Sequence, residues 1–139
     1  MTPVGAANIA FGMPIPAGGH SPRFERLCDE ARLRIREVEA SEAARLAREP
    51  GTVLVDVREE SEWAAGHAAG AIHLSKGVIE RDVEARIPDL DTRILCYCGG
   101  GYRSALAVES LARMGYRNAW SVAGGWRAWT AAGLPLDVG

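Results

Sequence analysis

The stretch Arg93–Gly115, RILCYCGGGYRSALAVESLARMG, contains three consecutive kinds of segment. Arg93–Tyr97 is mainly apolar and predicts a buried strand, and Ser104–Met114 has the composition and spacing of a helix that Gly115 ends. Cys98 and three glycines lie between them, at the carboxyl end of the strand, where ligands bind in α/β sheets. Three interpretations of Cys98 are open: a buried strand residue, one half of a metal pair, or a nucleophile.

The alternation of strands and helices continues on both sides of this stretch. Further strands are predicted at Ile35–Val38, Thr52–Val57, Ala71–Leu74 and Asn118–Val122. Helices are predicted at Glu42–Arg48, with Ser41 as the N-cap, and at Glu60–Ala65, Val78–Ile87 and Trp126–Ala132. Because strand and helix alternate from residue 35 to residue 132, the sequence predicts an α/β fold with a mostly parallel five-stranded sheet and helices on both faces.

The chain of 139 residues has the length of a single domain. Residues 1–22 carry no charged side chain apart from His20 and contain four glycines and four prolines, which is typical of a flexible arm without a core of its own. This N-terminal arm is also a candidate contact between two copies of the chain in a homodimer. Apolar residues at helical spacing predict an N-terminal helix over 23–34, and the core is expected over 35–137 of a domain that spans 23–139.

The composition excludes several classes of partner and cofactor. A net charge of −2 does not favour nucleic acid or an anionic membrane as a partner, and no apolar run reaches the roughly 20 residues of a membrane span. Three cysteines are an odd number and do not predict a disulfide framework, so we expect a cytoplasmic protein. Cys96 and Cys98 alone supply only two metal ligands, so we expect neither a metal nor an organic cofactor.

The glycine loop has the properties of an anion site. Glycines can take a positive φ and turn their amide N–H groups inward, and the helix that follows adds free N–H donors and a partial positive charge. The residues expected to bind an anion in this way are Gly99, Gly100, Gly101, Tyr102, Arg103 and Ser104. Such surroundings favour the thiolate form of a cysteine, so Cys98 is predicted to be an ionised nucleophile near neutral pH.

Several residues outside the loop have competing interpretations. Arg103 either acts electrostatically at the loop or pairs with a carboxylate that fixes the shape of the loop. Asp56 can face the site, although capping of the next turn is favoured, and Arg58 is expected to form a structural ion pair with Glu62. Asp56 and Arg58 are thus candidates for a supporting role. The expected framework residues are His67 and His73, as hydrogen-bonded groups, with Cys28, Cys96 and the four tryptophans in the core.

Three motifs resemble those of the rhodanese family of sulfurtransferases. The loop CGGGYRS is similar to the family's active-site loop, in which four residues separate a cysteine from an arginine. The stretch DVREESEWAAGHAAGAIHL (Asp56–Leu74) is similar to the family's first signature, and VAGGWRAWTAAGLPL (Val122–Leu136) is similar to its C-terminal signature. The motifs occur in the family's order, and the resemblance covers about residues 35–137.

The resemblance implies that Cys98 takes a sulfane sulfur from a donor such as thiosulfate or a persulfide and becomes a persulfide itself. The sulfur would then pass to a thiol or to cyanide, without a metal or an organic cofactor. Two alternatives stay open. Phosphatases and arsenate reductases of the dual-specificity type carry a related loop with one residue more between cysteine and arginine, and a non-catalytic sulfur carrier would keep the same cysteine and loop.

Overall fold

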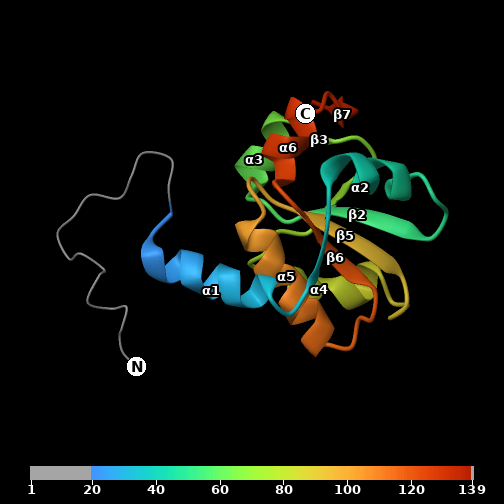
Figure 1. Ribbon diagram of the computed structural model, residues 1–139. Helices are drawn as coiled ribbons and strands as arrows, with labels where there is room; N and C mark the ends of the chain where they lie inside the picture. Colours follow the sequence, from blue (N-terminus) through green and yellow to red (C-terminus); the bar gives the residue numbers. More distant parts are fainter. Residues whose placement is uncertain (1–19, 139) are drawn as a thin grey trace.

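The computed structural model describes residues 20–138, so residues 1–19 of the expected N-terminal arm lie outside the described residues (Figure 1). The helices are α1 (Pro22–Arg32), α2 (Ala40–Ala47), α3 (Glu60–Ala65), α4 (Ile79–Arg86), α5 (Tyr102–Arg113) and α6 (Gly125–Ala131). The strands are β1 (Arg36–Val38), β2 (Thr52–Asp56), β3 (His67–Ala68), β4 (Ile72–His73), β5 (Arg93–Tyr97), β6 (Ala119–Val122) and β7 (Leu136–Asp137).

Five of the strands form one sheet in the order β1-β6-β5-β2-β4, and every pair of neighbours is parallel. The central strand β5 is buried from Ile94 to Tyr97, as expected for a parallel strand that is covered on both faces. The predicted five-stranded sheet is therefore confirmed. Because all five strands point the same way, their carboxyl ends meet at one edge, and Cys98 follows β5 at that edge.

Helices cover both faces of the sheet, as the sequence predicts (Figure 1). Strand residues such as Ile94 and Cys96 pack with α4 and α5 on one face, and Leu95 and Tyr97 pack with α2 and α6 on the other. The helix α1 lies along α5 and buries Cys28 and Ala31. The expectation that Cys28 and Cys96 belong to the core is confirmed, because both are fully buried.

Three differences from the sequence-based expectations concern the start of a helix or an additional pair of strands. The helix α2 begins at Ala40 with Glu39 as the N-cap, so the prediction of Ser41 as the cap is wrong. The helix α5 begins at Tyr102, because Gly101 takes a left-handed φ of 100° and serves as the N-cap. The antiparallel pair β3–β7 was not predicted, since two-residue strands are too short to show an alternating pattern.

The backbone of α6 begins unusually close to the loop that follows β5. At Gly125 φ is +52°, and a methyl group on its α-carbon would lie 2.2 Å from the carbonyl oxygen of Cys98. Neither the left-handed φ nor this approach is open to a residue with a side chain without movement of the backbone. Glycine at this position therefore allows the α6 N-terminus to contact the Cys98 loop directly.

The variant Gly125→Ala is expected to be destabilised by both effects, about 1 to 2 kcal/mol for the backbone conformation and about 1 to 3 kcal/mol for the steric conflict. Gly133→Ala is the matched control, because Gly133 has a φ of +67° but no atom within 4 Å of the added methyl group. Urea unfolding of both variants measures the difference. Equal destabilisation of the two variants would show that the close approach to Cys98 does not contribute to the loss of unfolding free energy.

Candidate active site

Cys98 lies at the carboxyl end of the central strand, with 1% of its surface exposed. Its Sγ accepts a hydrogen bond of 3.0 Å from the amide N–H of Gly101 and lies 3.5 Å from Ser104 Oγ. The positive φ of Gly101 turns this amide toward the sulfur. The sulfur thus has the Gly101 amide as a hydrogen-bond donor and, beside it, a hydroxyl group that can either donate or accept; donation from both groups would stabilise a sulfur anion.

Fewer amides donate to the Cys98 sulfur than the sequence predicts. Of the six residues expected to line an anion site, Gly101 is the one whose amide donates to Sγ within the described chain. Tyr102, Arg103 and Ser104 form the first turn of α5, and Gly99 and Gly100 take ordinary φ values. The contribution of these other amides to binding of a substrate anion stays a prediction.

The α6 N-terminus holds the outer side of the same loop. The amide of Trp126 donates to the Cys98 carbonyl at 2.6 Å, and the amide of Arg127 donates to the Gly99 carbonyl at 3.0 Å. The C-terminal signature in the sequence contains the Gly124–Gly125 pair, but it does not predict these hydrogen bonds. Their signal in the sequence is the pair of adjacent glycines itself, because close contact between two backbones requires residues without side chains.

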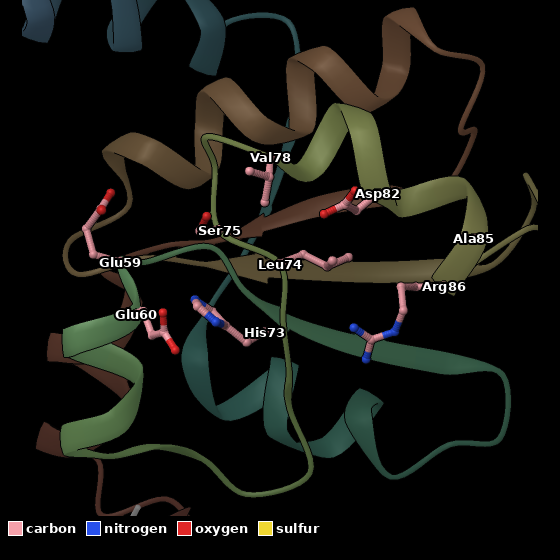
Figure 2. A pocket seen from close by; sticks show the side chains of 9 residues that line it. All are labelled: Glu59, Glu60, His73, Leu74, Ser75, Val78, Asp82, Ala85 and Arg86. Carbon is pink, nitrogen blue, oxygen red and sulfur yellow. The ribbon is translucent and has the colours of Figure 1, made fainter.

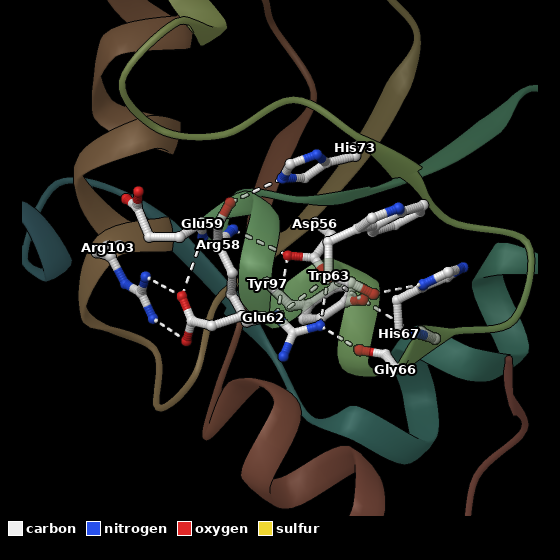
Figure 3. A network of polar contacts seen from close by, with 11 residues as sticks. Asp56, Arg58, Glu59, Glu62, Trp63, Gly66, His67, His73, Tyr97 and Arg103 are labelled. Atoms are coloured by element: carbon white, nitrogen blue, oxygen red, sulfur yellow. Dashed lines mark hydrogen bonds and ion pairs between the residues drawn. The ribbon is translucent and has the colours of Figure 1, made fainter. Parts of the chain in front are cut away.

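Arg103 forms an ion pair with Glu62 (Figure 3). The two guanidinium N–H groups donate to the two carboxylate oxygens at 2.8 and 3.1 Å, which joins the first turn of α5 to α3. Of the two roles expected for Arg103, the structure shows the pairing with a carboxylate. The predicted pair of Arg58 with Glu62 is wrong, because Arg58 binds Asp56 instead.

Asp56 and Arg58 form a buried ion pair at the carboxyl end of β2, next to Tyr97 of β5 (Figure 3). The guanidinium of Arg58 donates to both oxygens of Asp56 and also to the Gly66 carbonyl, and the backbone N–H of Arg58 donates to Asp56 as well. The expected capping of the turn by Asp56 is therefore confirmed. Tyr97 donates its hydroxyl hydrogen to Asp56 at 2.6 Å and accepts the amide of Ala68, and burial raises the pKa of Tyr97.

The two histidines belong to the framework around this network, as expected. His73 Nε2–H donates to the Arg58 carbonyl at 2.8 Å, and His67 Nδ1–H donates to the Trp63 carbonyl at 3.0 Å. The Trp63 ring stacks on the His67 ring with centroids 3.5 Å apart. Trp129 is a buried core residue, while the other three tryptophans are partly exposed. These contacts hold the α3–β4 segment in place next to the site.

Cys98 differs from the other two cysteines in its surroundings. Burial, with a smaller effect of the neighbouring Cys98, raises the pKa of Cys96 to about 12 and that of Cys28 to about 11. These two thiols are therefore protonated near neutral pH and are poor nucleophiles. Cys98 is the residue of the three that receives an amide hydrogen bond on its sulfur.

A hollow of about 640 Å³ lies beside the site, between the start of α3, the segment after β4 and α4 (Figure 2). Its lining includes the carboxylates of Glu59, Glu60 and Asp82 together with His73 and Arg86. Of the described residues, those of the Cys98–Ser104 loop do not line it. An excess of negative charge makes the hollow unsuitable for an oxyanion such as thiosulfate.

Neither a metal site nor a membrane span is found in the part of the chain that the structure describes. Within residues 20–138, no group of three His, Cys, Asp or Glu side chains is arranged to bind a metal ion. No helix in the same range combines the length and the apolar composition that crossing a bilayer requires.

The fold agrees with comparisons to known proteins. The sequence model of the rhodanese-like domain family matches residues 39–132, and the chain belongs to this family. The thiosulfate sulfurtransferase GlpE of Haemophilus influenzae is 34% identical over 88 residues, which are 63% of this chain and 82% of that protein. Sulfurtransferases are thus among the relatives of this chain.

Two solved structures resemble a larger part of the chain. A protein of unknown function from Rhodopseudomonas palustris, described as a possible tyrosine phosphatase, matches with a TM-score of 0.73 and 27% identity over 91% of this chain and 100% of that chain. The polysulfide-sulfur transferase homodimer of Wolinella succinogenes matches with a TM-score of 0.73 and 25% identity over 84% of this chain and 88% of that chain.

The ion pair of Glu62 with Arg103 predicts a pH-dependent contribution to stability. The hydrogen bond from Arg103 lowers the pKa of Glu62 from 4.5 to about 2. A folded-state pKa below the unfolded value stabilises the protein above pH 4.5, and this stabilisation disappears as the pH falls from 4.5 to about 2. Because the pair is partly exposed, its contribution is expected to be at most about 1 kcal/mol.

The test compares the free energy of unfolding of the wild type with that of Glu62→Gln at several pH values. The variant is expected to be less stable at neutral pH, and the two proteins should become equal near the acid end of this range. Glu60→Gln is the control in the same helical turn and should show no such convergence. A difference between wild type and Glu62→Gln that stays constant with pH would contradict the ion-pair argument.

Proposed function

We propose that this protein is a sulfurtransferase that carries sulfur as a persulfide on Cys98. The observation that carries the proposal is the position of Sγ, at the carboxyl end of the central strand with the Gly101 amide at 3.0 Å and the Ser104 hydroxyl at 3.5 Å. Membership of the rhodanese-like domain family and the likeness to a thiosulfate sulfurtransferase support it.

The reaction has two displacement steps at sulfur. The Cys98 thiolate attacks the sulfane sulfur of the donor, a bond forms between Sγ and that sulfur, and the bond to the rest of the donor breaks, so that sulfite leaves thiosulfate with the electron pair. An acceptor thiolate or cyanide then attacks the outer sulfur, and Cys98 leaves as a thiolate. The Gly101 amide stabilises the anion on Sγ at the start and at the end.

A phosphatase is the second candidate, because one structural relative is described as a possible tyrosine phosphatase. Two features of this chain favour sulfur transfer. Only four residues separate Cys98 from Arg103, which makes a tighter loop than the related phosphatases have. The guanidinium of Arg103 also uses two of its N–H groups to bind Glu62, and these two groups are then not available to bind a phosphate.

The charge of the loop suggests which donors are preferred. Residues 99 to 101 are glycines and carry no cation, and the nearest arginine, Arg103, is balanced by Glu62. The loop therefore offers backbone dipoles but little net positive charge to a dianion such as thiosulfate. We infer that persulfides or polysulfides are better donors than thiosulfate, and the likeness to a polysulfide-sulfur transferase supports this inference.

Replacement of Cys98 by serine is expected to abolish sulfur transfer from thiosulfate to cyanide, because serine forms no persulfide. Thiosulfate treatment should add one sulfur to the wild type in an intact-mass spectrum, and a reductant should remove it. Cys96→Ser and Cys28→Ser are the controls and should keep most of the activity if they remain folded. Transfer by Cys98→Ser at the wild-type rate, or Cys98-dependent hydrolysis of an aryl phosphate faster than sulfur transfer, would contradict the proposal.

The variant Gly100→Lys tests the argument about charge. Position 100 can accept a side chain, because its φ is ordinary and the atom nearest to an added methyl group is 4.0 Å away, on Tyr102. An added cation is expected to lower the KM for thiosulfate roughly tenfold at low salt and less at high salt. Turnover with a neutral persulfide should change little. An unchanged KM for thiosulfate in the variant would contradict the inference about donors.

A further inference from the structure

Ser121 is a buried hydroxyl group that neither the fold nor the proposed reaction accounts for. It lies on β6 next to Cys96 of β5, and it is fully buried. Its Oγ is 2.8 Å from Ser104 Oγ, and within the described residues this is the hydrogen bond that its side chain makes. A buried hydroxyl on a central strand has a desolvation cost, so a hydrogen-bonding role is expected for it.

The number of hydrogens on the two serines determines the direction of their hydrogen bond. Each hydroxyl carries one hydrogen, and a bond between the two oxygens uses only one of them. The other hydrogen needs a second acceptor. Ser104 Oγ lies 3.5 Å from the Sγ of Cys98, and both atoms are buried. Both hydrogens are used when Ser121 donates to Ser104 and Ser104 donates to Sγ.

The reverse arrangement leaves a group without a partner. If the Cys98 thiol donated to Ser104 and Ser104 donated to Ser121, the Ser121 hydrogen would have no acceptor among the described residues. A buried donor without an acceptor is unfavourable, whereas a hydroxyl that donates to an anionic sulfur forms a charge-assisted bond. Both serine hydrogens therefore have an acceptor when Ser104 donates to Sγ, and this hydrogen bond is stronger to a thiolate than to a thiol.

We infer that Ser121 is a positioning residue for the Cys98 nucleophile: by donating to Ser104 Oγ, it directs the Ser104 hydrogen to Sγ and so favours the thiolate. This inference rests on the proposed function, since it gives Cys98 the role of the nucleophile. Ser104 then becomes the second donor to Sγ, beside the Gly101 amide. The inference also gives the buried Ser121 hydroxyl on β6 a role in the chemistry at the end of β5.

The test measures the alkylation rate of Cys98 by iodoacetamide at about pH 6 and about pH 10, with peptide mass mapping to identify the modified cysteine. Ser121→Ala is expected to slow alkylation roughly threefold to tenfold at the lower pH, because the sulfur anion loses a directed hydrogen bond. It should not slow alkylation at the higher pH, where hydroxide in the solvent, rather than the serine pair, promotes formation of the thiolate. Ser110→Ala, a matched change on α5, is the control and should behave as the wild type does.

A double-mutant cycle separates the positioning role from a merely structural one. Because Ser121 acts through Ser104, Ser121→Ala should cause no further slowing in a Ser104→Ala background. Thermal unfolding of each variant shows whether it is folded. The inference is overturned if Ser121→Ala has no effect at the lower pH, slows alkylation equally at both pH values, or keeps its full effect without the Ser104 hydroxyl.

The alkylation assay does not depend on sulfur transfer, so the two proposals can fail separately. Sulfur transfer by Cys98→Ser at the wild-type rate would overturn the proposed function. The alkylation result would then still describe the reactivity of the Cys98 thiol. Loss of transfer in Cys98→Ser together with unchanged alkylation in Ser121→Ala would overturn only the role of Ser121.

Discussion

The hydrogen bond from the Trp126 amide to the Cys98 carbonyl determines the geometry of the candidate active site. It joins the start of α6 to the end of β5, and it is possible only because Gly125 lets the two backbones approach. With the Cys98 carbonyl held on one side and α5 beginning after Gly101 on the other, the chain between them has little freedom. The sulfur is therefore positioned by backbone contacts, and the glycine loop does not need side chains for this purpose.

The buried pair of Asp56 and Arg58 explains how the other charges near the site are arranged. Asp56 is fully buried, and a buried carboxylate without a cation is far more costly than an exposed one. Arg58 therefore binds Asp56, and Tyr97 supplies a further hydrogen bond to the same carboxylate. Glu62, which is partly exposed, is left for Arg103, and this pair joins α3 to the first turn of α5.

Much of the fold follows from patterns in the sequence. The ends of the predicted strands and helices differ from the observed ones by at most two residues, because apolar spacing and the glycines and prolines between segments are local signals. The position of Cys98 follows in the same way from the strand, glycine loop and helix. The pair β3–β7 could not be predicted, because two residues show no period and their pairing joins segments far apart in the chain.

The sequence by itself determined the order of the elements, the parallel sheet, and the place of Cys98 at the edge where the strands end. It could not determine which partners the side chains choose. The pairing of Arg58 with Asp56 rather than with Glu62 depends on burial, and the contact of Ser121 with Ser104 depends on how β6 packs under α5. Local patterns act over a few residues, whereas burial and distance between remote groups exist only after the chain has folded, so only the tertiary structure decided them.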